Sequence, residues 1–197
     1  MRVLAFSDLH LSRRHARALV EASGEADLVI GAGDFCHVRE GLDEAMSLLE
    51  GVPAPMVVVP GNSETAKELR AAALSGTTVL HGEGVEVEGL RLFGLGGGIP
   101  VTPFGDWSFD LTENQAAEML DRCTGAELLI THSPPKGIAD VTSRSVSVGS
   151  TAIRDAIARL QPALAVCGHV HDCWGREGRI GDSRVVNLGP GPNWFNL

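Results

Sequence analysis

Positive charge is scarce in this chain, and tyrosine is absent. The 197 residues include 16 lysines and arginines against 25 aspartates and glutamates, which gives a formal net charge of -9. A protein of this charge is a poor partner for nucleic acid or for an anionic membrane, although it leaves room for a local positive site. We therefore expect no broad nucleic-acid surface and no membrane contact. The missing tyrosine reflects genome composition more than chemistry.

Long apolar runs and paired cysteines are missing as well. Asp8 and His10 interrupt the N-terminal apolar run before a signal-peptide core or a membrane span is complete, and we expect a cytoplasmic protein. The four cysteines are Cys36, Cys123, Cys167 and Cys173. They form no CxxC pair, and a chain of this length can bury a core without disulfides, so we expect reduced thiols.

The apolar residues that are present occur in short runs that alternate with helical patterns. With 44% hydrophobic residues and no long linker, residues 1–197 are expected to form one domain that buries about 70% of its unfolded surface. Five runs have the composition of buried strands, at residues 3–7, 28–33, 56–61, 128–132 and 163–168. Amphipathic helical patterns follow the first three runs, at residues 15–22, 42–50 and 64–74. This alternation predicts βαβ units and a mainly parallel sheet.

The second half of the chain adds hairpins and two more helices. Residues 85–95 and 174–189 alternate apolar and polar side chains around glycines, which predicts antiparallel hairpins. Helical patterns at residues 112–122 and 150–160 begin with Thr112 and Ser150 as expected caps. These hairpins and helices complete a mixed α/β pattern.

Residue types that bind metals follow the five predicted buried strands. Asp8 and His10 follow the first run, Asp34 the second, Asn62 the third, His132 the fourth, and His169 and His171 the fifth. In an open α/β sheet these strand ends converge on one crevice, where ligands bind. His169 and His171, two positions apart, would leave an extended strand end in the same direction. Each residue alone has a structural explanation as a cap, a turn residue or a core imidazole, but the whole set indicates a metal centre.

Asp34 is the candidate bridge between two metal ions. Two cations about 3.5–4 Å apart need a shared ligand, and a carboxylate has the two oxygens required. Gly33 allows the sharp turn before it. The mixed donors suit manganese, our first choice, or iron, cobalt, zinc or nickel, better than calcium or magnesium. Because only Asp8 and Asp34 bring formal charge, two divalent ions would retain a positive surplus that attracts phosphate.

The motifs that carry these residues occur in a recognisable order. They are Asp8-Leu9-His10, Gly33-Asp34, Gly61-Asn62, His132 and Gly168-His169-Val170-His171. Together they resemble the calcineurin-like metallophosphoesterase superfamily. Residues 95–107, 131–140, 148–162 and 185–191 are similar to a prokaryotic branch of predicted phosphoesterases related to cyclic-nucleotide phosphodiesterases. The resemblance implies an α/β fold, a four-layer αββα sandwich of two mixed β-sheets flanked by helices.

The resemblance also implies the ligand sets and an activity. One metal would be bound by Asp8, His10, Asp34 and His171, and the other by Asp34, Asn62, His132 and His169. The implied activity is a dinuclear metal-dependent phosphohydrolase, with a phosphodiesterase favoured, in which a metal-bridging hydroxide attacks phosphorus in line. His132, Asn62 and Asp34 are the expected catalytic residues, and a small phosphodiester or nucleotide is the expected substrate. The alternatives are a phosphomonoesterase or protein phosphatase, and a non-catalytic metal-site scaffold for protein partners.

The chain departs from the superfamily pattern after Asn62. Most members have a histidine where Ser63 stands, followed by Asp or Glu, which is Glu64 here. That histidine is usually assigned to protonating the leaving group or steadying the phosphate, and Ser63 cannot supply a proton near neutral pH. Activated or cyclic diesters, which need little protonation, are therefore the expected substrates. Glu64 either orients Asn62 or opens the following helix.

Several features of the loops have two interpretations. The longest irregular stretches are residues 96–110 and 133–149, and loops of this length are often functional. Within the second stretch, Lys136 and Arg144 either meet the substrate or are solvated loop charges. His37 contacts substrate, supports a ligand, or occupies the surface at a helix start. Residues 192–197 either enter the core or form a dimer contact.

Overall fold

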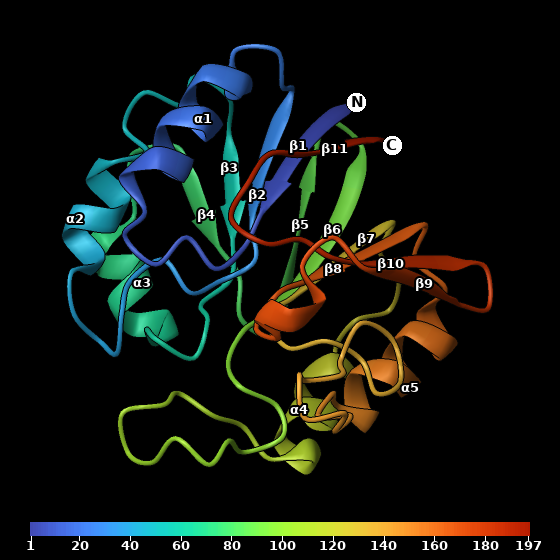
Figure 1. Ribbon diagram of the computed structural model, residues 1–197. Coiled ribbons are helices and arrows are strands. Elements are labelled where there is room, and N and C mark those ends of the chain that lie inside the picture. The colour runs from blue at the N-terminus through green and yellow to red at the C-terminus, as the bar shows by residue number, and fades with distance from the viewer.

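Two β-sheets lie face to face between two groups of helices in the computed structural model, which describes residues 1–197 (Figure 1). The first sheet has the order β11-β1-β2-β3-β4 and the second the order β5-β6-β7-β8-β10-β9. The first sheet contains β1 (Arg2–Phe6), β2 (Leu28–Gly31), β3 (Met56–Val58), β4 (Thr77–Val79) and β11 (Asn193–Asn196). The second contains β5 (Glu83–Val87), β6 (Leu90–Leu95), β7 (Leu128–Thr131), β8 (Leu164–Cys167), β9 (Glu177–Ile180) and β10 (Ser183–Asn187).

Parallel pairing dominates the middle of both sheets. Strands β1 to β4 are parallel neighbours, as are β6, β7, β8 and β10. Antiparallel strands close one edge of the first sheet, where β11 pairs with β1, and both edges of the second, where β5 and β9 lie. Both predicted hairpins are therefore confirmed, as β5–β6 and β9–β10.

The alternation of side chains along each strand explains the four layers. On β1, Val3 and Ala5 join the core between the sheets, whereas Leu4 and Phe6 face the helices of the first sheet. On β7, Leu128 and Ile130 enter the same central core. Because successive strand residues point to opposite faces, an all-apolar strand can pack against a sheet on one side and helices on the other. The expected αββα sandwich is confirmed.

Helices cover the outer face of each sheet. The first sheet is covered by α1 (Arg13–Ser23), α2 (Leu42–Ser47) and α3 (Ala66–Ala72), and the second by α4 (Glu113–Leu120) and α5 (Thr151–Leu160) (Figure 1). The Thr112 hydroxyl accepts a hydrogen bond from the backbone N–H of Gln115 at 3.3 Å, and the Ser150 hydroxyl accepts one from Ile153 at 3.1 Å. Both predicted caps are present, because these side chains satisfy N–H groups that have no partner within the helix.

Two edge strands were not anticipated from the sequence pattern. Strand β4 has only three residues, and β11 lies within residues 192–197, where Arg2 pairs with Asn196. Short edge strands have little apolar periodicity, so a pattern search does not detect them. The C-terminal segment therefore extends the first sheet. None of the helices has the length and apolar character needed to cross a membrane.

Candidate metal centre

The carboxyl ends of five parallel strands bring all seven predicted ligand residues together. They follow β1, β2, β3, β7 and β8, as the sequence predicts. Ligand atoms of Asp8, His10 and His171 lie within 4.8 Å of one another, and so do those of Asp8, Asp34 and His132. The remaining two residues, Asn62 and His169, join through Asn62 Oδ1, which lies 2.9 Å from His169 Nδ1 and 3.2 Å from His132 Nε2.

Asp34 lies between the two groups of donors. Its Oδ2 is 3.5 Å from His10 Nε2, and its Oδ1 is 3.4 Å from His132 Nε2. The turn that places it depends on Gly33, which has a φ of +90°. A Cβ at that position would lie 2.6 Å from the backbone of Gly61 and 2.7 Å from His132 Nδ1. Glycine is required there by both the dihedral angle and the close approach of the next loop.

The hydrogen bonds of two histidines determine which ring nitrogen faces the centre. His10 Nδ1 lies 3.0 Å from the carbonyl oxygen of Cys36, and His132 Nδ1 lies 2.8 Å from that of Ala32. A carbonyl oxygen can only accept, so both Nδ1 atoms carry the proton in the neutral rings. Each Nε2 therefore directs a lone pair into the cluster, and His10 Nε2 lies 3.2 Å from His171 Nε2. Lone pairs of several side chains thus point into one small space, and a metal ion bound there would accept them. The donor set therefore fits metal ions.

Outer hydrogen bonds orient the amide of Asn62. Its Nδ2 donates to the hydroxyl of Ser108 at 3.1 Å, and that hydroxyl donates to Asp110 at 2.8 Å. With Nδ2 engaged in this way, Oδ1 points at His132 and His169, which is the orientation a metal ligand needs. The loop at residues 96–110 thus supports the site.

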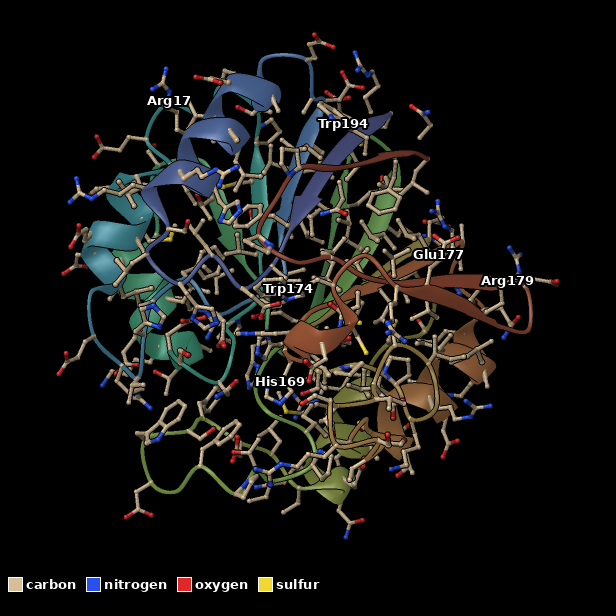
Figure 2. All side chains as sticks on the ribbon, in the orientation of Figure 1. Arg17, His169, Trp174, Glu177, Arg179 and Trp194 are labelled. Carbon is tan, nitrogen blue, oxygen red and sulfur yellow. The ribbon has the colours of Figure 1, made fainter.

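Trp174 positions Asp8 and was not identified from the sequence. Its indole N–H donates to Asp8 Oδ2 at 2.8 Å, while the backbone N–H of His169 donates to Asp8 Oδ1 at 3.0 Å. The Trp174 ring also lies 4.6 Å from the ring of His171. Figure 2 shows Trp174 and His169 near the middle of the molecule, where the two halves meet. No local pattern in the sequence indicates this contact, because Trp174 and Asp8 are 166 positions apart.

Glu64 has a role that differs from both interpretations of the sequence. It neither bonds to Asn62 nor belongs to α3, whose N-cap is Thr65. Instead its buried carboxylate accepts backbone N–H groups from Asp34 at 2.9 Å and from Gly61 at 2.6 Å. Burial and the charge of Asp34 raise the pKa of Glu64 to about 7. Glu64 therefore ties the Asp34 loop to the Asn62 loop.

The backbone at His169 and His171 also differs from the expectation. Strand β8 ends at Cys167, His169 has a left-handed φ of +66°, and His171 opens a 3₁₀ turn that spans His171–Cys173. The two side chains reach the same cluster through this bend and not through an extended strand. The left-handed residue is stabilised by the hydrogen bond from its N–H to Asp8.

Electrostatics within the cluster separate the histidines into two kinds. Burial, with the charge of His132, lowers the pKa of His169 to about 3, and burial lowers the pKa of His171. Burial also opposes charge on His132, but Asp34 and Asp8 outweigh it and raise its pKa. For Asp34, burial is outweighed by His132 and His10, and its pKa is lowered. His169 and His171 thus keep a lone pair available, whereas protons compete for His132.

Two adjoining cavities open above the cluster. The smaller, about 280 Å³, is lined by candidate ligands together with His37, Ser63, Phe104 and Trp107. His37 stacks on His10 with ring centroids 4.7 Å apart, so it borders the site and supports a candidate ligand. The larger, about 760 Å³, lies between residues 100–104 and 142–149.

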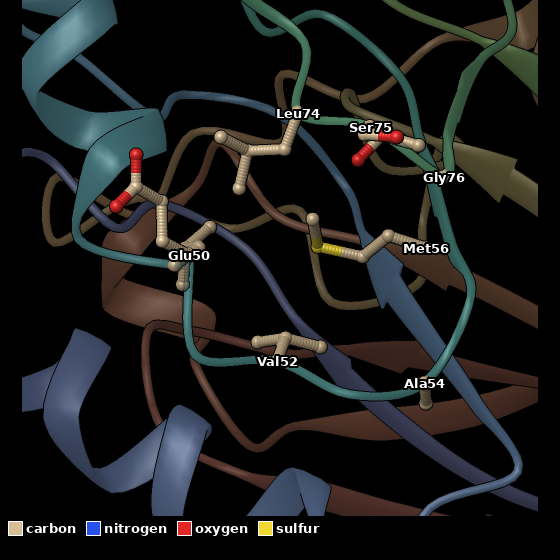
Figure 3. Close-up of a pocket in the computed structure, with 9 residues that line it drawn as sticks. Glu50, Val52, Ala54, Met56, Leu74, Ser75 and Gly76 are labelled. Carbon is tan, nitrogen blue, oxygen red and sulfur yellow. The ribbon is translucent and has the colours of Figure 1, made fainter.

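A third cavity lies away from the cluster. Its volume is about 290 Å³, and Figure 3 shows apolar side chains such as Leu74, Val52 and Met56 around it, with one carboxylate, Glu50. This cavity holds no cluster of potential metal ligands.

The fold and the cluster define an αββα sandwich with a candidate metal centre. Residues 1–194 match the model of the calcineurin-like phosphoesterase superfamily domain, and the chain belongs to this family. Human metallophosphoesterase domain-containing protein 1 is 32% identical over 130 residues, which cover 62% of this chain and 37% of the human protein. The match therefore spans little more than a third of that relative's length.

Solved structures share the fold at low sequence identity. The crystal structure of TT1561 from Thermus thermophilus has a TM-score of 0.76 and 16% identity, and the alignment covers 99% of this chain and 98% of that one. A dimetal phosphatase from Danio rerio has a TM-score of 0.65 and 13% identity, over 96% of this chain and 88% of that one. At these identities the likeness extends to the fold alone. Membership in the family and the donor cluster at the strand ends are thus established independently of these structures.

Proposed function

We propose that the chain is a dinuclear metal-dependent phosphodiesterase. The position of Asp34 carries this proposal, because its two oxygens face His10 and His132, one in each group of donors. Asp8, His10, Asp34 and His171 would hold one ion, and Asp34, Asn62, His132 and His169 the other. The mixed carboxylate, amide and imidazole donors suit manganese, or iron, cobalt, zinc or nickel. When bound, such ions supply a nucleophile at neutral pH and neutralise charge on the phosphoryl oxygens.

The protein residues hold the site in one arrangement before substrate arrives. The carbonyl of Ala32 fixes the ring of His132, Ser108 fixes the amide of Asn62, and Trp174 fixes the carboxylate of Asp8. Groups that are already oriented need not reorganise as charge develops in the reaction, which is the main source of electrostatic catalysis. His132, Asn62 and Asp34 are the residues we expect to carry the chemistry.

Ser63 supports a diester substrate over a monoester. It lines the smaller cavity, where its hydroxyl cannot act as an acid near neutral pH. A diester with a good leaving group departs without a proton, whereas an alkyl monoester does not. A small phosphodiester or nucleotide fits the two cavities. We also propose a cytoplasmic location, because all four cysteines are unpaired thiols.

The test combines metal content with a matched pair of substrates. Protein loaded with manganese should contain two ions per chain by elemental analysis. It should hydrolyse bis(p-nitrophenyl) phosphate with a higher kcat/KM than p-nitrophenyl phosphate, and Asp34→Asn should abolish both activities. Fewer than two ions would refute the dinuclear site. Preference for the monoester would indicate a phosphomonoesterase, and two ions without hydrolysis of either ester would indicate a scaffold for protein partners.

A further inference from the structure

The larger cavity adjoins the proposed reaction centre and is bordered by part of it. His169, His171 and Phe104 line both cavities. The smaller cavity, over the candidate ligands, has room for a phosphoryl group. The larger, at about 760 Å³, is of the size that holds an organic ligand of nucleotide dimensions. A phosphorus atom at the cluster would therefore place one of its ester groups in the larger cavity.

Carboxylates hold both walls of the larger cavity in place. On one wall, Asp110 accepts hydrogen bonds from the backbone N–H and the hydroxyl of Thr102, each at 2.8 Å. On the other wall, Asp172 accepts the backbone N–H of Ser143 at 2.7 Å. The loop with Ser143 is thus anchored next to His171. The loop with Thr102 is anchored by Asp110, which also helps to orient Asn62. Each wall thus has a hydrogen-bonded anchor close to the candidate ligands.

Phe104 offers an aromatic surface at the junction of the cavities. Its side chain is half exposed, and its ring is 6.4 Å from that of His169. Trp107 stacks behind it, with ring centroids 5.6 Å apart and planes 12° from parallel. A ring that is supported on one face and open to a cavity is a platform for another planar group.

Arg144 offers an unpaired positive charge at the rim of the same cavity. It lies in the turn where the N–H of Thr142 donates to the carbonyl of Val146 at 2.9 Å. No ion pair of the chain includes Arg144. The other cation of this wall, Lys136, is engaged with the carbonyl of Ser147 at 2.7 Å. In a chain of net charge -9, a guanidinium that lines this cavity without an ion-pair partner is suited to an anionic group on the substrate.

We propose that the larger cavity binds the organic ester group of the substrate, and that this group is planar, of nucleoside size and bears a second anionic group. Phe104 stacks on the planar part, and Arg144 pairs with the second anion. These two residues therefore determine specificity for a doubly anionic, nucleotide-like diester. The proposal rests on the proposed phosphodiesterase function.

Three substrates with the same p-nitrophenolate leaving group test the proposal. They are methyl p-nitrophenyl phosphate, thymidine 5′-(p-nitrophenyl phosphate), and the latter with an additional 3′-phosphate. The first has no planar group besides the leaving group that all three share, the second adds the planar thymine base, and the third adds the second anion. For the metal-loaded wild type, kcat/KM should rise at each step of the series, mainly through KM.

Two variants should each remove one step of that series. Phe104→Ala should reduce the gain from methyl to thymidine ester, by roughly fivefold to hundredfold from the usual strength of base stacking. Arg144→Gln should leave that gain intact and remove the additional gain from the 3′-phosphate, which is at most roughly fivefold for an exposed ion pair. Trp194→Ala and Arg14→Gln, which alter an exposed aromatic and an exposed arginine away from the cavity, are the matched controls.

The outcomes separate this inference from the proposed function. A wild type that hydrolyses all three diesters equally, or variants that lower all three rates alike, would overturn the specificity proposal while the phosphodiesterase remains. If no diester is hydrolysed by protein that contains two ions, the proposed function itself fails. Loss of the stacking gain in Trp194→Ala would also count against a role for Phe104.

Discussion

Replacing Trp174 by phenylalanine should weaken one proposed metal site and spare the other. The substitution removes the indole N–H that donates to Asp8 Oδ2 at 2.8 Å, and it keeps an aromatic ring beside His171. In the proposed assignment Asp8 is a ligand of only one ion, the one also held by His10, Asp34 and His171. The hydrogen bond from the His169 backbone to Asp8 Oδ1 remains, so the carboxylate loses half of its support.

The size of the effect follows from the lost hydrogen bond. A hydrogen bond to a charged group contributes about 1.5–3 kcal/mol. At about 1.4 kcal/mol for each factor of ten, this corresponds to roughly 10- to 100-fold weaker binding of one ion. Loss of a group that orients a metal ligand has an effect of the same order, roughly 10- to 100-fold.

Isothermal titration of the apo-protein with manganese measures both sites. We expect two binding steps in the wild type. In Trp174→Phe, the dissociation constant of one step should rise by that factor, and the dissociation constant of the other step should stay unchanged. Trp194→Phe is the control, since Trp194 lies near the chain termini, far from Trp174 in Figure 2. If the two steps weaken equally, or neither weakens, Trp174 does not position Asp8 for a metal ion.

Three further predictions concern other parts of the site. Asp34→Asn should deplete both ions, whereas His171→Ala should deplete mainly one; elemental analysis that finds the same loss in both variants would contradict the bridge. Ser63→His should raise turnover of unactivated esters, by at most roughly 10²- to 10⁴-fold, with unchanged metal content, and a wild type that already prefers alkyl monoesters would contradict this. Burial raises the pKa of Asp140, but hydrogen bonds from Ser147 and two backbone N–H groups outweigh it, and the pKa is lowered. The ionised Asp140 carboxylate thus stabilises the fold at pH values above its ordinary pKa of about 3.9. This stabilisation is lost as the pH falls through the lowered pKa of the folded state. Asp140→Asn should therefore lower Tm at pH 7 and change it little near pH 2, and a difference in Tm that is independent of pH would contradict this.

The sequence predicts those parts of the fold that depend on residues close together in the chain. The five buried strands, the two hairpins and the caps Thr112 and Ser150 all depend on side chains within a few positions of one another. The sequence also predicts that the residues at the strand ends lie together, because parallel strands place their carboxyl ends at one edge of the sheet. Edge strands β4 and β11 were missed, since their short segments have no clear apolar period.

The remaining features depend on contacts between distant parts of the chain. The hydrogen bond from Trp174 to Asp8 and the one from Asn62 to Ser108 join residues 166 and 46 positions apart. The left-handed backbone at His169 is stabilised by Asp8, which lies on another strand end. No periodicity or motif records such pairs, because they arise only when the two sheets pack together. The sequence therefore predicts which residues meet, but not how their partners orient them.

The departure at Ser63 can be understood from the two residues that follow Asn62. Glu64 bonds to the backbone of Asp34 and Gly61, and the backbone N–H of Ser63 donates to Asp34 Oδ1 at 2.8 Å. Neither contact uses the side chain of residue 63. The hydrogen bonds that connect the Asp34 loop with the Asn62 loop therefore do not require a particular side chain at position 63. We therefore expect a change at position 63 to alter the group that faces the smaller cavity, and with it the choice of substrate, more than the candidate metal site.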